Sequence, residues 1–94
     1  MPSIQISRTH AKNMKEARVA IEHVAEKLAE KFSVDYGWEG NTLHFERLGV
    51  HGNIALGRGR VDIAVQLGFL LSALRGPIEA EIHRYIDREL GPEA

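Results

Sequence analysis

The sequence predicts a two-layer α+β domain in which two amphipathic helices cover one face of an antiparallel sheet, in the order β-α-β-β-β-β-α. Apolar residues recur every three or four positions in two long segments, as they do on one side of a helix. Between these segments apolar and polar residues alternate, which is typical of strands with one buried face. Glycine-containing pairs interrupt the alternation three times, as expected for hairpin turns. The 94 residues suffice for a single domain, residues 1–94.

The N-terminal third of the chain predicts the first strand and the first helix. Ile4 and Ile6 alternate with polar residues, which indicates a short strand. Asn13 and Glu16 have the spacing of a capping box, in which each side chain binds a free backbone amide at a helix start. The helix should end near Ser33. Its apolar stripe comprises Met14, Ala17, Ile21, Val24, Leu28 and Phe32.

Three hairpins are predicted in the middle of the chain. Gly40-Asn41, Leu48-Gly49 and Arg58-Gly59 suit two-residue turns, because glycine and asparagine tolerate positive φ. With loops of this length the apolar residues of four strands align on one face, and a shift of one residue would mix the faces. The two apolar rows comprise Trp38, Leu43, Ile54 and Ile63, and Tyr36, Phe45, Gly52 and Val65. We expect the first strand to pair beside the last one.

The C-terminal segment joins the last strand to the second helix. Pro77 suits the first position of a helix, so we expect this helix to begin there and to end at Gly91-Pro92. The crossing before it contains a run of large apolar residues. We expect Phe69 to be buried there, together with Leu71 or Leu74.

Composition limits the function classes. Lys and Arg number 12 against 13 Asp and Glu, and this balance argues against a nucleic-acid partner. The absence of cysteine excludes disulfides, thiolate catalysis and cysteine zinc sites. No signal peptide or membrane-spanning run is evident, so we expect a cytoplasmic protein.

Two patterns are candidates for catalysis or metal binding. His44 and His51 fall on the polar face with Glu46 and Asn53, and four such residues can in principle ligate a divalent ion. A solvated cross-strand Glu–His pair is the simpler interpretation. Ser72 lacks both a Gly-x-Ser-x-Gly context and an identifiable base. We therefore expect no catalytic residue, no metal ion and no cofactor.

A ligand pocket is a third candidate. Aromatic side chains between a sheet and its helices can line a cavity for a small apolar molecule. The alternative is that these side chains are simply the core of a small domain. The residues concerned are Tyr36, Trp38, Phe45 and Ile63.

Three segments resemble a known family: MPSIQISRTH, WEGNTLHFERLGVHGNI and VQLGFLLSALRGPIEAEIHRYIDREL. They are similar to the polyhydroxyalkanoic acid system proteins, small bacterial proteins named for their association with polyester storage-granule loci. The strand and helix order also resembles a shortened START-like, helix-grip fold, which binds ligands. The family has no established catalytic residues that could be carried over.

The resemblance implies an accessory or regulatory role. Polyester synthesis in such systems uses a cysteine nucleophile and depolymerisation a serine elbow, and this chain has neither. We therefore expect a non-enzymatic protein that binds a granule, a granule-associated protein or a second copy of itself as a homodimer. A binding domain for an acyl or hydroxyacyl ligand is the alternative. The candidate contact surface comprises Phe69, Leu70, Leu71 and Leu74.

Overall fold

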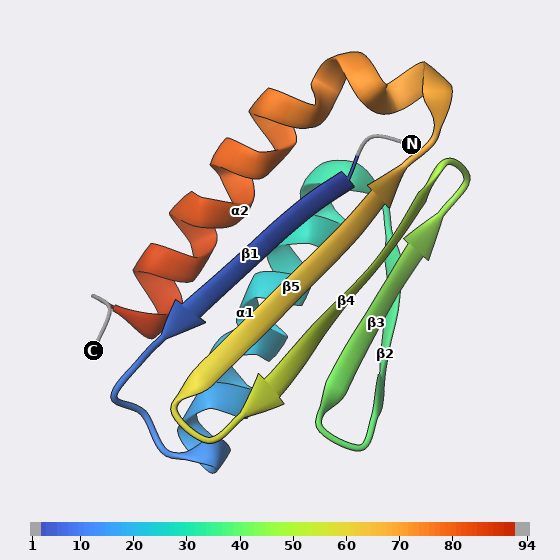
Figure 1. Ribbon diagram of the computed structural model, residues 1–94. Helices are drawn as coiled ribbons and strands as arrows, with labels where there is room; N and C mark the ends of the chain where they lie inside the picture. Colours follow the sequence, from blue (N-terminus) through green and yellow to red (C-terminus); the bar gives the residue numbers. More distant parts are fainter. Residues whose placement is uncertain (1–2, 92–94) are drawn as a thin grey trace.

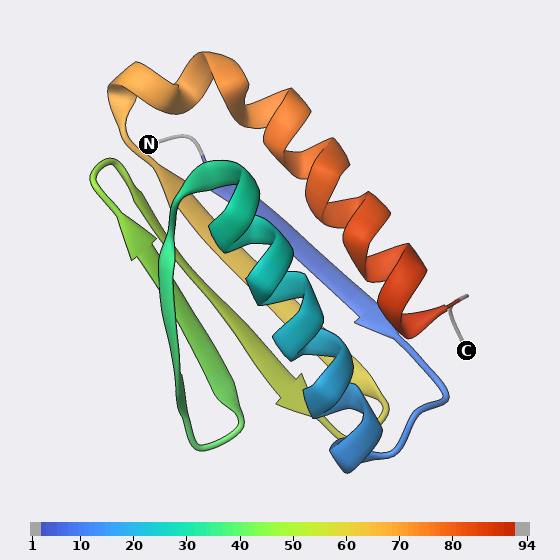
Figure 2. The ribbon, with the colours of Figure 1, turned by 180° about the vertical axis from the view of Figure 1, so that it is seen from behind.

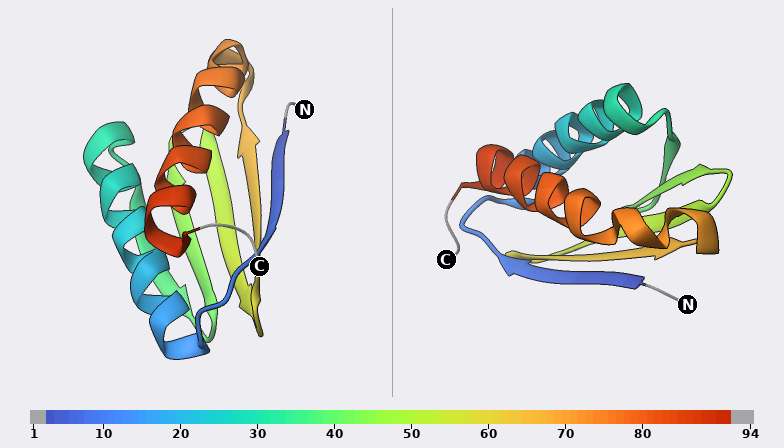
Figure 3. Two further views of the ribbon diagram at one scale, coloured as in Figure 1. Left: turned by 90° about the vertical axis from the view of Figure 1, so that its left-hand side faces the viewer. Right: turned by 90° about the horizontal axis from the view of Figure 1, so that it is seen from above.

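The structure, a computed structural model, describes residues 3–91 apart from the side chain of Leu70. Both helices lie on one face of a single sheet, and the other face is left uncovered by the described part of the chain (Figures 1 and 3). This arrangement is the predicted two-layer α+β fold. The elements are β1 (Ser3–Thr9), α1 (Met14–Phe32), β2 (Asp35–Glu39), β3 (Thr42–Arg47), β4 (Val50–Gly57), β5 (Arg60–Leu67), the 3₁₀ helix η1 (Phe69–Leu74) and α2 (Arg75–Leu90).

The sheet has five antiparallel strands in the order β1-β5-β4-β3-β2. The predicted register is confirmed in all three hairpins, because Trp38 pairs with Leu43, Leu43 with Ile54, and Ile54 with Ile63. The predicted place of the first strand is also confirmed, and β1 adds Ile6 to this apolar row. The apolar face is therefore continuous across all five strands.

Helix α1 begins and ends where the sequence predicts. The Asn13 side chain accepts from the Glu16 amide at 2.8 Å, and the Glu16 carboxylate accepts from the Asn13 amide at 3.2 Å. At the other end Ser33 adopts a left-handed conformation with φ of 57°, which stops the helix. The helix packs along the sheet (Figure 2). Its buried face comprises Ala17, Ala20, Ile21, Val24, Ala25 and Leu28.

The crossing from β5 to α2 differs from the prediction. It forms the 3₁₀ helix η1, and α2 begins at Arg75, so Pro77 occupies the third helical position and not the first. Proline is tolerated there because the first four amides of a helix have no partner within the helix. The prediction that Phe69 is buried is wrong, since this side chain is 86% exposed. Leu71 points inward and packs against the core.

A buried arginine ties the first strand to the last helix. Arg8 lies on the inner face of β1 and is 8% exposed. Its guanidinium donates to Asp87 at 2.5 Å and to the Gly91 carbonyl at 3.0 Å. A cation at a helix C-terminus is favourable because the last carbonyls carry partial negative charge. Arg8 therefore holds the C-terminal end of α2 over β1.

The core contains one position where only glycine fits. Phe45 and Gly52 are cross-strand partners on β3 and β4. A Cβ atom built on Gly52 would lie 2.3 Å from Cζ of Phe45, well inside van der Waals contact. The Phe45 ring is 5% exposed and belongs to the core. The missing side chain of Gly52 thus provides the space that the ring occupies.

Replacing Gly52 by alanine should therefore destabilise the fold. We expect Gly52→Ala to lower the free energy of unfolding by about 1–3 kcal/mol, because the Phe45 ring must shift within a packed core. Gly37→Ala is the matched control, since a Cβ on Gly37 meets no atom within 4 Å. Its effect should stay within about 0.5 kcal/mol. Urea unfolding measures both, and equal effects of the two variants would contradict this account.

A hydrogen bond on the uncovered face also makes stability depend on pH. The Ser7 hydroxyl donates to the Asp62 carboxylate at 2.6 Å, across β1 and β5. This hydrogen bond is the main cause that lowers the pKa of Asp62 below its ordinary value of 3.8, and Arg60 adds to it. The contact therefore stabilises the folded state above pH 3.8 and is lost as pH falls through the pKa of the folded state.

We expect Ser7→Ala to raise the pKa of Asp62 toward its ordinary value. Carboxyl ¹³C NMR titration of the Asp62 side chain measures this directly. Ser3→Ala is the control, because Ser3 lies on the same strand and the same face but pairs with Gln66. An Asp62 pKa that stays the same in Ser7→Ala, or that shifts as far in Ser3→Ala, would refute the role of Ser7.

Candidate functional site

Large exposed apolar side chains gather at one end of the molecule. Leu48 is 95% exposed in the β3–β4 turn, Phe69 is 86% exposed at the start of η1, and Leu74 is 48% exposed at its end. The Gly68 amide donates to the Gly49 carbonyl at 2.7 Å, which fixes the turn beside η1. Figure 1 shows the two segments side by side. We call the group of Leu48, Phe69 and Leu74 the apolar end.

The predicted contact residues differ in exposure. Phe69 and Leu74 point outward, whereas Leu71 is half-buried and packs against the core. The side chain of Leu70 lies outside the described residues. Leu48 was missed by sequence reasoning, which treated it only as a turn residue. Its neighbour Gly49 meets the η1 segment only in the folded chain, so no local sequence signal identifies Leu48.

Beneath the apolar end lies a cavity of about 70 Å³. It is bounded by the last turns of α1, by the junction of η1 and α2, and by strands β3, β4 and β5. Ten of the eleven lining residues are apolar, and the exception is Arg47. The lining comprises Leu28, Phe32, Val34, Phe45, Arg47, Val50, Val65, Leu71, Leu74, Ile78 and Ile82.

Arg47 is the last residue of β3, and its side chain is exposed. Its Nη1 donates to the Phe32 carbonyl at 2.7 Å, one of the unpaired carbonyls at the end of α1. Within residues 3–91 no ion pair from Arg47 to a carboxylate is found at 4.0 Å or less. A positive charge thus stands beside an apolar cavity.

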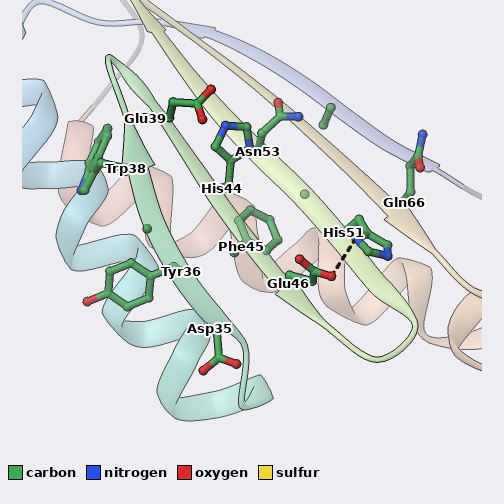
Figure 4. Close-up of a pocket in the computed structure, with 13 residues that line it drawn as sticks. Asp35, Tyr36, Trp38, Glu39, His44, Phe45, Glu46, His51, Asn53 and Gln66 are labelled. Atoms are coloured by element: carbon green, nitrogen blue, oxygen red, sulfur yellow. Dashed lines mark ion pairs between the residues drawn. The ribbon is translucent and has the colours of Figure 1, made fainter.

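Three of the four predicted pocket residues, Tyr36, Trp38 and Phe45, border an open hollow on the sheet, and Ile63 does not. Phe45 and Ile63 belong to the buried core beneath the helices. Trp38 and Tyr36 turn instead toward α1 (Figure 4). Of the four, Phe45 alone lines the cavity beneath the apolar end.

Trp38 and Tyr36 connect the edge strand β2 to α1. The Trp38 indole donates to the Glu22 carboxylate at 2.7 Å, and the Arg18 guanidinium lies 4.1 Å from the centre of its ring. A hydrogen bond with Glu22 raises the pKa of Tyr36 above its ordinary value of 10.0, and burial adds to the increase. These aromatic residues therefore have a structural role, which sequence periodicity could not separate from ligand binding.

The sheet carries an open hollow of about 570 Å³, which is bordered by polar side chains of the uncovered face and by aromatic side chains (Figure 4). His44 and His51 both border it, as predicted from the register. His51 lies 3.6 Å from Glu46, which matches the solvated cross-strand pair. No cluster of three or more histidine, aspartate or glutamate residues able to hold a metal ion occurs in the described part of the chain.

Ser72 takes part in a local turn. Its hydroxyl donates to the Phe69 carbonyl at 2.8 Å, within η1. Such hydrogen bonds are typical of serine in tight turns. This contact gives Ser72 a structural role in the crossing.

Neither helix of the described chain is long and apolar enough to cross a membrane.

Comparison with known proteins identifies the family. A family model described as "Putative polyhydroxyalkanoic acid system protein" matches residues 4–90. No curated protein and no solved structure matches, so the resemblance to a START-like fold stays a prediction. The match spans both the hairpins and the apolar segment in which the resemblance was seen. The chain belongs to the family of polyhydroxyalkanoic acid system proteins.

Proposed function

We propose that this protein is a non-enzymatic accessory protein of the polyhydroxyalkanoate system, which acts in the cytoplasm by contacting the surface of the storage granule. The observation that carries the proposal is the exposure of Leu48 and Phe69, at 95% and 86%, side by side at one end of the fold. Contiguous exposed apolar side chains mark interaction sites in many proteins. The family supplies the biological setting.

The apolar end has a shape that an apolar surface can contact. Leu48 and Phe69 lie on a tight turn and on the first residue of η1, so they project from the fold. Burying one such side chain contributes about 1.5–3 kcal/mol. One copy should therefore bind reversibly. The predicted homodimer would present two apolar ends and strengthen the contact.

Removing the two most exposed apolar side chains should weaken granule binding. We expect Leu48→Ser combined with Phe69→Ser to reduce the affinity for purified granules by about tenfold or more, as measured by co-sedimentation. Val19→Ser is the matched control, because Val19 is 53% exposed but lies on α1, toward the other end of the molecule. It should sediment like the native protein.

Two results would contradict the proposal. One is native protein that is no more enriched on granules than an unrelated protein of equal net charge. The other is equal sedimentation of the double variant and the native protein. Co-sedimentation is repeated with granules whose surface proteins have been removed by protease. Loss of binding to these granules would show that the partner is a granule protein. It would overturn direct contact with the granule surface.

A further inference from the structure

We infer that the cavity beneath the apolar end binds a short-chain alkanoic acid, with the aliphatic chain inside the cavity and the carboxylate on Arg47. The cavity shares only Leu74 with the apolar end, because neither Leu48 nor Phe69 lines it. The inference goes beyond the proposed granule contact and does not depend on it. The family provides only the choice of probe, since polyhydroxyalkanoates are built from hydroxyalkanoic acids.

The size and lining of the cavity determine the length and the apolar character of the ligand's aliphatic chain. Its volume of about 70 Å³ is near half that of an engineered apolar cavity of about 150 Å³ that binds benzene. A chain of about three or four carbon atoms fits such a space. Apart from Arg47 the walls are apolar, so a polar chain would leave its groups without hydrogen-bond partners.

The walls of the cavity also indicate where the ligand enters. The floor is formed by nearly fully buried residues, with Val65 and Ile82 each 1% exposed and Leu28 3% exposed. The outer wall is formed by the η1–α2 junction, where Leu74 is 48% exposed. A ligand can therefore enter past Leu74 without opening the core.

Arg47 determines which polar group the ligand carries, namely a carboxylate. A guanidinium has five N–H donors, and the described chain shows one of them used, on the Phe32 carbonyl. That hydrogen bond holds the group in place, which reduces the entropy lost on binding. A carboxylate can accept two parallel hydrogen bonds from a guanidinium. An amide of the same size cannot form an ion pair with it.

Titration of ¹⁵N-labelled native protein with butyrate tests the site. We expect saturable shifts of the Val50 and Leu71 amide signals, because both residues line the cavity. Butyramide has the same chain without the charge and should bind about tenfold more weakly. Octanoate, whose chain exceeds the cavity, should also bind more weakly than butyrate.

Variants separate the two parts of the ligand. Arg47→Met removes the charge but keeps an apolar stem, and it should weaken butyrate binding by about tenfold. Arg58→Met is the matched control, since Arg58 is exposed in the β4–β5 turn at the other end of the molecule. Leu71→Phe should fill the cavity and abolish binding while Arg47 remains.

Several results would overturn the inference. These are the absence of saturable shifts, equal binding of butyrate and butyramide, and equal losses in Arg47→Met and Arg58→Met, which would indicate non-specific anion binding. If Arg47→Met fails to fold, the comparison of butyrate with butyramide on native protein still decides. The Leu48→Ser and Phe69→Ser variant should keep butyrate binding, so failure of the granule contact and failure of this site remain distinguishable.

Discussion

The register of the four-stranded meander is the constraint on which the rest of the structure depends. Because side chains alternate between faces, one register places the large apolar residues of the hairpin strands on one side. That side must be covered, and the two amphipathic helices are the elements that can cover it. The fit of the Phe45 ring over Gly52 supports the same register. A shifted pairing would place a residue with a side chain opposite the ring, where only glycine leaves room.

Two helices cover the five-stranded sheet less completely at the end where they diverge. Helix α1 ends near Phe32, and α2 is reached through the η1 crossing, so at this end of the sheet the two helices lie farther apart than at the other end (Figure 3). The cavity lies at this place, and Leu71 enters its wall from the crossing. The apolar end is the outer side of the same junction. One geometric feature thus creates both the proposed contact surface and the proposed ligand site.

The candidate site was only partly predictable from sequence. The sequence marks the crossing as an apolar segment with more large residues than a connection needs, but the prediction that Phe69 is the buried one is wrong. Which of them face outward depends on the phase of η1, and a short 3₁₀ turn has no amphipathic pattern long enough to reveal its phase. Trp38 illustrates the same limit, because its partners Glu22 and Arg18 lie on a helix that local periodicity cannot orient relative to β2.

The sequence by itself determined the order of the elements, the limits of α1, the three turns and the register of the hairpins. These features depend on contacts that are local or that follow from the period of two in a strand. Only the tertiary structure decided that Gly49 and Gly68 meet, that Leu48 thereby joins Phe69 at one end, and that Arg47 stands beside an apolar cavity. Those features depend on contacts between distant segments, which are set by how the helices and the crossing pack on the sheet and not by any local pattern.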